Sequence, residues 1–117
     1  MVALGEEISG MFVNQTELKN RLLTASYEAG EKLWELPLEK EYKETLKSHI
    51  ADLRNISTTR YGGAITAALF LEEFVDGLPW AHLDIAGPAF AEKDTPLTLS
   101  GGTGFGVRLV LQYLLSL

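Results

Sequence analysis

Residues 10–30 read GMFVNQTELKNRLLTASYEAG, and this stretch decides the expected fold. Its opening apolar run, residues 11–13, is short and bounded by turn residues, which predicts a buried strand that ends at Asn14. Asn14 and Glu17 are spaced like a capping box at the start of a helix. An apolar stripe at helical spacing follows: Leu18, Leu22, Ala25 and Ala29. Because Gly30 then favours a helix end, the stretch predicts a strand followed by a helix.

The middle of the chain is expected to hold less regular structure. Residues 31–38 are predicted to connect two elements, because their proline lacks an N–H donor and disfavours helical angles before it. Residues 39–47 are rich in Glu and Lys, which predicts a mostly solvated helix with i, i+4 pairs such as Glu39 with Lys43. For residues 50–53 we expect a short strand, followed by a polar loop.

The second half alternates again between helix and strand signals. A glycine pair opens a helix that is apolar nearly all round and is expected to be deeply buried until Gly77 stops it. Residues 80–86 alternate with period two, which predicts a strand, and residues 87–100 are expected to form a long loop. The glycine-rich residues 101–106 lead into a last helix. Its predicted buried face comprises Val107, Val110, Leu111 and Leu114.

This order of elements, β-α-α-β-α-β-α, predicts an α/β fold in which helices cover a sheet. A chain of 117 residues buries about two thirds of its unfolded surface, which suits one core. We therefore treat residues 1–117 as part or all of one domain, with no internal repeat.

Composition excludes several classes of function. Ten Lys and Arg against sixteen Asp and Glu give a net charge of −6, which disfavours nucleic acid and anionic lipid surfaces as partners. The absence of cysteine removes disulfides, thiolate metal ligands and thiol nucleophiles. No apolar run approaches the roughly 20 residues of a membrane span, and the N-terminus lacks a signal-peptide pattern. We therefore expect a cytoplasmic protein.

The glycine-rich turn before the last helix raises the possibility of a phosphate site. Backbone N–H groups at a helix N-terminus attract anions. However, residues 102–106 read GTGFG, which is neither GxGxxG nor a P-loop, and no strand follows. The alternative is that small residues let this segment pass close to neighbouring backbone, and the sequence favours it.

His82 and Asp84 are the other candidate chemical pair. They lie two apart on one strand face, where they could bind a metal or act as a base and its orienting group. The alternative is a structural pair hydrogen-bonded to backbone. His49 is the only other histidine, and two ligands are too few for a tetrahedral site. With no Gly-x-Ser-x-Gly elbow and with its acid pairs adjacent, the chain offers no complete catalytic set.

Residues 80–89, WAHLDIAGPA, resemble a signature stretch of the leucine aminopeptidase (cytosol aminopeptidase) family. Other segments resemble the family in the same order: residues 2–5, 10–14, 30–31, 34–38, 51–55, 62–68 and 101–108. The resemblance extends over essentially the whole chain. It implies that residues 1–117 are the C-terminal portion of the catalytic domain, a partial helix-covered sheet from a three-layer α/β/α peptidase domain with two metals.

The resemblance also implies a chemistry that this chain would share only in part. Enzymes of the family use two divalent metals, zinc, manganese or magnesium, to activate water against the first bond of a peptide. Their metal ligands and catalytic Lys and Arg lie upstream of the matched region. We therefore expect no catalytic residue and no metal ligand in this chain, and no activity from it alone.

What carries over is part of the pocket for the first side chain of the peptide substrate. Ala86 and Ala89 match positions that line it, although the residue at the Ala89 position varies in size among relatives. The family also forms hexamers, so a homo-oligomer is expected. The alternatives are a non-catalytic pseudoenzyme or oligomerisation module that pairs through an exposed sheet edge, and a nucleotide-binding domain that rests only on the glycine turn.

Overall fold

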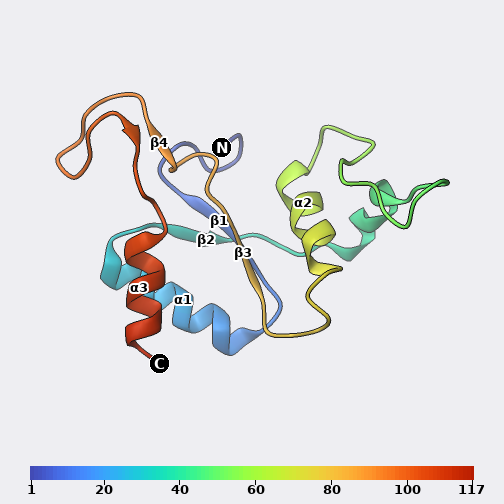
Figure 1. Cartoon of the computed structure of the whole chain (residues 1–117), viewed down its shortest axis with the longest axis horizontal. Coiled ribbons are helices and arrows are strands. Elements are labelled where there is room, and N and C mark those ends of the chain that lie inside the picture. The colour runs from blue at the N-terminus through green and yellow to red at the C-terminus, as the bar shows by residue number, and fades with distance from the viewer.

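The computed structural model describes all residues, 1–117, and is built around a three-stranded sheet (Figure 1). Its strands are β1 (Ser9–Val13), β2 (Leu33–Glu35) and β3 (Ala81–Asp84), in the order β2-β1-β3. The central strand β1 pairs in parallel with β2 and antiparallel with β3. The α/β fold expected from the sequence is therefore confirmed, with a mixed sheet.

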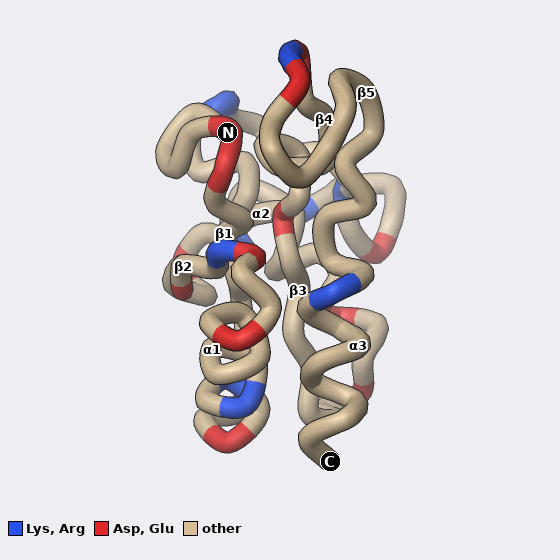
Figure 2. Tube along the Cα trace, turned by 90° about the vertical axis from the view of Figure 1, so that its left-hand side faces the viewer, with Lys and Arg blue, Asp and Glu red and all other residues tan.

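Two helices cover one face of this sheet. Figures 1 and 2 show α1 (Thr16–Ala29) and α3 (Val107–Leu115) side by side against it, with both ends of the chain at the surface. A core cluster joins β1, α1, β2 and α3 through one buried side chain from each: Met11, Leu22, Leu33 and Leu109. Removing these side chains from water is the main favourable term that fixes the helices on the sheet.

A second group of elements lies beyond the other side of the sheet, at the right of Figure 1. The 3-10 helix η1 (Lys40–Leu46) packs on helix α2 (Gly63–Glu72), and each contains a buried leucine, Leu46 and Leu69. Lys43 of η1 also forms an ion pair of 2.6 Å with Glu73, directly after α2. None of the helices is long and apolar enough to cross a membrane.

The hairpin β4 (Phe90–Ala91) and β5 (Gly101–Gly102) projects above α3, as Figure 2 shows. The sequence predicted residues 87–100 as a loop only. That prediction was wrong at β4, because its pairing partner is the glycine segment, whose composition gives no strand signal.

The predicted first helix is confirmed, but its cap is not the predicted one. Gln15 is the N-cap, and its side chain accepts a hydrogen bond of 3.2 Å from the Leu18 amide. Asn14 instead ties two strands together, because its side chain donates to the Leu78 carbonyl and accepts from the Trp80 amide, both at 2.8 Å. The Asn14 side chain, which the local pattern predicted as a helix cap, instead makes hydrogen bonds to residues much later in the sequence.

Two other expectations in the first half were wrong. The predicted connection 31–38 contains β2, whose backbone is satisfied by pairing with β1; the Leu36 amide, for example, donates to the Met11 carbonyl at 2.8 Å. The predicted strand 50–53 does not form. Its first amides donate instead to the Ser48 hydroxyl, and the Ile50 side chain is exposed with no strand beside it.

The predicted burial of the later helices also needs correction. Helix α2 is buried on one side only, since Leu69 is inaccessible while Leu71 is exposed. In α3 the fully buried residue is Leu109, not the predicted stripe, all of whose members are exposed in this chain: Val107, Val110, Leu111 and Leu114. The apolar residues of α3 lie on most of its circumference, so their spacing does not decide which one faces the sheet.

Candidate functional site

The two candidate pocket residues lie on one tight turn. Strand β3 ends at Asp84, two residues earlier than predicted, and the chain turns through residues 85–89. The Ala89 amide donates to the Ile85 carbonyl at 2.9 Å, and the Ala86 amide donates to the Asp84 carboxylate at 3.1 Å. Ala86 is exposed and Ala89 is partly buried. The structure therefore brings both residues together at the carboxyl end of β3.

One side of this turn packs on the N-terminal segment. Gly87 is buried, and a Cβ atom at this position would lie 2.5 Å from the Gly5 carbonyl oxygen and 3.2 Å from the Glu6 Cα. Only glycine allows the two backbones to approach so closely. The turn is thus fixed against residues from the opposite end of the sequence.

The other side of the turn is held by Thr103. Its hydroxyl donates to the Pro88 carbonyl at 2.5 Å, and its amide donates to the Ala89 carbonyl at 3.0 Å. The same hydroxyl accepts a hydrogen bond of 3.2 Å from the Phe105 amide. Thr103 therefore joins the turn to the glycine-rich segment, a role that no pattern in the sequence indicated.

Glu31 is a second residue that sequence reasoning missed. Its side chain is only 4% exposed, and one carboxylate oxygen accepts the amides of Gly106 at 2.9 Å and Leu109 at 3.1 Å. Arg108 approaches the other oxygen at 3.4 Å. The carboxylate therefore caps α3, whose own N-cap is a glycine without a side chain.

This cap argues against a phosphate site on the glycine-rich turn. The two amide donors already bond to the carboxylate of Glu31, whose negative charge would repel a second anion. The alternative, close passage against neighbouring backbone, was wrong as well, because a Cβ atom at the four glycines of residues 101–106 would meet no atom within 4 Å. Backbone conformation favours glycine here instead, since Gly104 and Gly106 have positive φ, at 69° and 99°.

His82 and Asp84 do not form an acid–base pair. The His82 ring stacks against Trp80 at a centroid distance of 6.3 Å and lies 6.0 Å from Phe12. Burial lowers the pKa of His82, and the Asp84 carboxylate opposes part of that change. The Asp84 side chain bonds to backbone instead. This arrangement supports the structural alternative.

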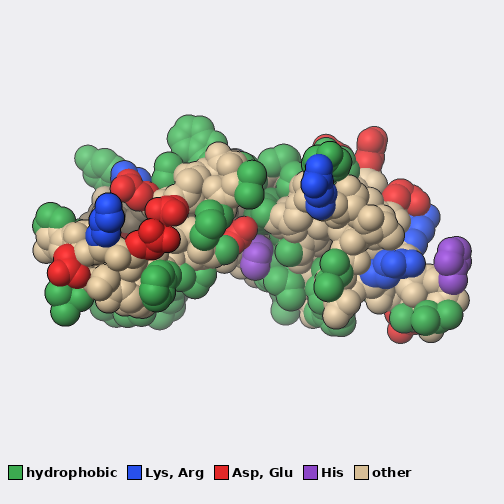
Figure 3. All heavy atoms as spheres, turned by 90° about the horizontal axis from the view of Figure 1, so that it is seen from above, with side chains coloured by type: hydrophobic (Ala, Val, Ile, Leu, Met, Phe, Trp, Pro, Cys, Tyr) green, Lys and Arg blue, Asp and Glu red, His purple; other side chains and the backbone are tan.

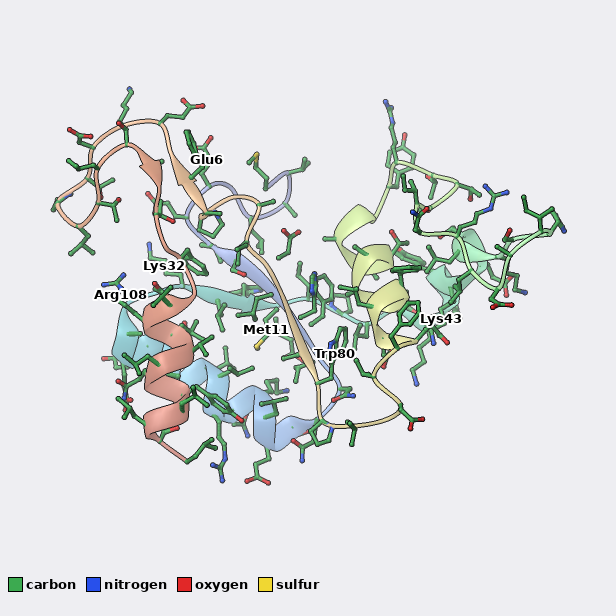
Figure 4. All side chains as sticks on the ribbon, viewed as in Figure 1. Glu6, Met11, Lys32, Lys43, Trp80 and Arg108 are labelled. Carbon is green, nitrogen blue, oxygen red and sulfur yellow. The ribbon has the colours of Figure 1, made fainter.

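A cavity of about 510 Å³ lies between the hairpin, the N-terminal segment and α3. Its charged walls include Glu6, Lys32 and Arg108, which Figure 4 labels, with Glu6 above the other two. Figure 3 shows acidic side chains on this half of the molecule and others toward its opposite end. Ala86 and Ala89 do not line this cavity, but Pro88 of the same turn and Thr103 do, so the turn borders it.

The residues of this chain do not fit a site for two divalent metals. No three His, Asp or Glu side chains are placed to hold one ion. Glu72, Glu73 and Asp76 line a cavity of about 280 Å³, but they are not placed to share one ion. There Lys43 bonds to Glu73, and this bond raises the pKa of the lysine, so its cation already balances that carboxylate.

Comparison with known proteins decides the family. The sequence profile of the "Cytosol aminopeptidase family, catalytic domain" matches residues 1–111. The chain belongs to the cytosol aminopeptidase family. It is 53% identical over 116 residues to a "Probable cytosol aminopeptidase" of Picosynechococcus sp., covering 99% of this chain and 23% of that protein. The chain thus spans about a quarter of the length of such relatives.

Solved structures share the fold of this chain. A mutant of tomato leucine aminopeptidase matches with a TM-score of 0.92 and 40% identity, covering 100% of this chain and 22% of its own. The bottromycin maturation enzyme BotP, solved in complex with Mn, matches with a TM-score of 0.93 and 42% identity over 98% of this chain and 26% of its own. The resemblance seen in the sequence is therefore confirmed.

Proposed function

We propose that this chain forms the wall of the substrate pocket in a metal-dependent leucyl aminopeptidase, which releases the first residue of a peptide. The observation that carries the proposal is the turn 85–89, fixed on both sides at the carboxyl end of β3. Because β3 runs antiparallel to β1, this turn lies at the edge of the sheet where β1 and β2 begin. Support from both sides holds its two small side chains in fixed positions, as a binding pocket requires. Membership of the cytosol aminopeptidase family supports the reaction class.

In this proposal Ala86 and Ala89 contact the side chain of the first substrate residue. Both side chains are small and apolar, and that of Ala86 is exposed at the surface of the turn. Two small side chains leave room for an isobutyl group. Moving that group from water into an apolar pocket stabilises the bound complex. The expected preference is therefore for leucine, and the role of the chain is to bind and orient that side chain.

The two divalent metals of the proposed enzyme, zinc, manganese or magnesium, belong to residues outside this chain. The absence of a fitting ligand set among residues 1–117 motivates this assignment. BotP, solved with Mn, supports metal dependence in a relative. By itself the chain is expected to bind no stoichiometric metal and to hydrolyse no leucyl amide.

We further propose a homo-hexamer in the cytoplasm as the setting of this enzyme. Exposed apolar side chains on α3, such as Leu111 and Leu115, offer surface for association. The name of the relatives and the lack of cysteine support a cytosolic location. Nothing observed favours the non-catalytic alternatives, since the relatives are described as aminopeptidases.

The test is to join this chain to the upstream part of the Picosynechococcus relative and to assay leucine p-nitroanilide hydrolysis with Mn²⁺ or Zn²⁺. The joined protein should hydrolyse the substrate, while the chain alone and the upstream part alone should not. A joined protein that folds and binds metal but gives only the rate of the upstream part alone would contradict the proposal.

A further inference from the structure

The turn that carries both alanines is held by backbone packing on one side and by hydrogen bonds on the other. On the first side, the backbone of Gly5 and Glu6 lies against Gly87 with no side chain between them. On the other side, all hydrogen bonds from outside the turn to the Pro88 and Ala89 carbonyls come from Thr103. Thr103 is therefore the outside hydrogen-bond donor that holds the two carbonyls at the Ala89 end of the turn.

Thr103 is itself anchored in both directions along the chain. The preceding residue, Gly102, pairs with Phe90 in the β4–β5 hairpin. Beyond it, the amides of Gly106 and Leu109 bond to the buried Glu31 carboxylate, and the Leu109 side chain is fully buried. The threonine thus connects the turn to the core of the molecule through short, well-defined contacts.

The hydroxyl of Thr103 does what an isosteric apolar group cannot do. It donates to the carbonyl of the buried Pro88 and accepts from the Phe105 amide. With valine in its place, both backbone groups would lose their partner in a partly buried position, which is costly. The turn would then move or open toward water to satisfy them.

We propose that Thr103 is a positioning residue for the first-residue pocket, holding the Pro88–Ala89 end of the turn and so setting discrimination between large and small first side chains. This inference rests on the proposed function. The residue acts through Ala89 and does not touch the reacting atoms. Its loss is therefore expected to affect binding of leucine substrates more than the rate of the chemical step.

The experiment compares Thr103→Val with Thr103→Ser in the joined, metal-loaded enzyme. The valine variant should raise KM for leucine p-nitroanilide about tenfold, the effect of losing one or two hydrogen bonds, with kcat nearly unchanged. KM for alanine p-nitroanilide should change little. The serine variant keeps the hydroxyl and should restore the wild-type ratio. Thr98→Val, the same change on a partly buried threonine of the hairpin loop whose hydroxyl bonds to Thr95, is the matched control.

A second measurement separates this proposal from the proposed function. Amide hydrogen exchange in the 117-residue chain should be about tenfold faster at Phe105 and Ala89 in the valine variant, and unchanged in the serine variant. An active enzyme whose Leu to Ala ratio is unaffected by Thr103→Val, or unchanged exchange, would overturn the role of Thr103. Inactivity of every version, wild type included, would overturn the proposed function and with it the specificity role.

Discussion

The Glu31 carboxylate caps helix α3 by accepting a hydrogen bond of 3.1 Å from the amide of Leu109, which lies 78 residues later in the sequence. The same oxygen accepts the Gly106 amide at 2.9 Å. A buried carboxylate at a helix N-terminus is stabilised by charge-assisted hydrogen bonds and by the helix dipole. This contact fixes α3 beside the start of β2, and it thereby holds the glycine segment that supports the turn 85–89.

Replacing Glu31 by Gln should therefore destabilise the chain. The amide keeps the shape but loses the charge that strengthens both hydrogen bonds, so we expect a loss of about 1–3 kcal/mol in the free energy of unfolding. Urea denaturation followed by circular dichroism measures it. Glu7→Gln is the matched control, because its ion pair with Lys32 is exposed and should be worth less than about 1 kcal/mol. Equal losses in the two variants would contradict the capping role.

Adding one methyl group at Gly87 should disturb the turn directly. A Cβ atom there would lie 2.5 Å from the Gly5 carbonyl oxygen, so backbone must shift in Gly87→Ala. Overpacking of this kind costs about 1–3 kcal/mol, measurable as a lowered midpoint of thermal unfolding. Gly63→Ala is the control, because nothing lies within 4 Å of the added atom and alanine favours helix α2. A Gly87→Ala variant as stable as wild type would show that the N-terminal segment does not fix the turn.

His82 should make stability depend on pH in a definite direction. Burial lowers its pKa in the folded chain below the ordinary 6.5, so the unfolded chain binds the proton more tightly. The contribution of the neutral His82 ring to the stability of the folded chain is therefore complete above pH 6.5. It is lost as the pH falls from there toward the lowered pKa. Urea unfolding from about pH 8 to about pH 5 should show a smaller decline for His82→Gln than for wild type. Parallel profiles would contradict burial of the neutral ring.

Local patterns in the sequence predicted the elements whose own residues show a clear periodicity. The apolar stripe of α1 and the alternation in β3 were sufficient to locate both. Strand β2 was missed because its three residues form a strand only by pairing with β1. The Glu31 cap was missed for the same reason, since nothing near residue 31 in the sequence announces a helix that starts at Val107.

The residues of the candidate site were also beyond the reach of local sequence patterns. No periodicity or spacing pointed to Ala86 or Ala89, and only the resemblance of residues 80–89 to a family did. The hydrogen bonds of Thr103 join segments whose proximity depends on the β4–β5 hairpin. A glycine-rich segment gives no strand signal, so that proximity could not be predicted from the sequence.

The exposed apolar face of α3 should make the isolated chain self-associate. Its Cα radius of gyration is 15.4 Å, against about 13 Å for a compact domain of this length, and Leu111 and Leu115 are 55% and 72% exposed. Light scattering during size-exclusion chromatography should show species larger than 12.9 kDa. The double variant Leu111→Glu, Leu115→Glu should shift them toward monomer, while Ile50→Glu, in an exposed loop, should not. A wild-type chain that stays monomeric at high concentration would contradict this expectation.

The pocket assignment can be tested at Ala86, the exposed residue of the turn. In the joined, metal-loaded enzyme, Ala86→Phe would place a ring where the leucine side chain is expected to bind. Leucine turnover should fall roughly 10- to 200-fold relative to alanine turnover, the range over which an apolar pocket discriminates small differences in size. Because an alanine methyl reaches less deeply, its turnover should change less. The measurement is kcat/KM for both p-nitroanilides in folded protein.

The matched control for this change is Ala67→Phe, which adds the same ring to an exposed alanine of α2, away from the turn. It should leave the leucine to alanine ratio of kcat/KM unchanged, because helix α2 is not part of the proposed pocket. If Ala86→Phe also leaves this ratio unchanged while the protein remains folded and active, Ala86 does not contact the first side chain. The turn 85–89 would then be a structural link between β3 and the β4–β5 hairpin, and the apolar wall would have to come from other residues of the complete enzyme.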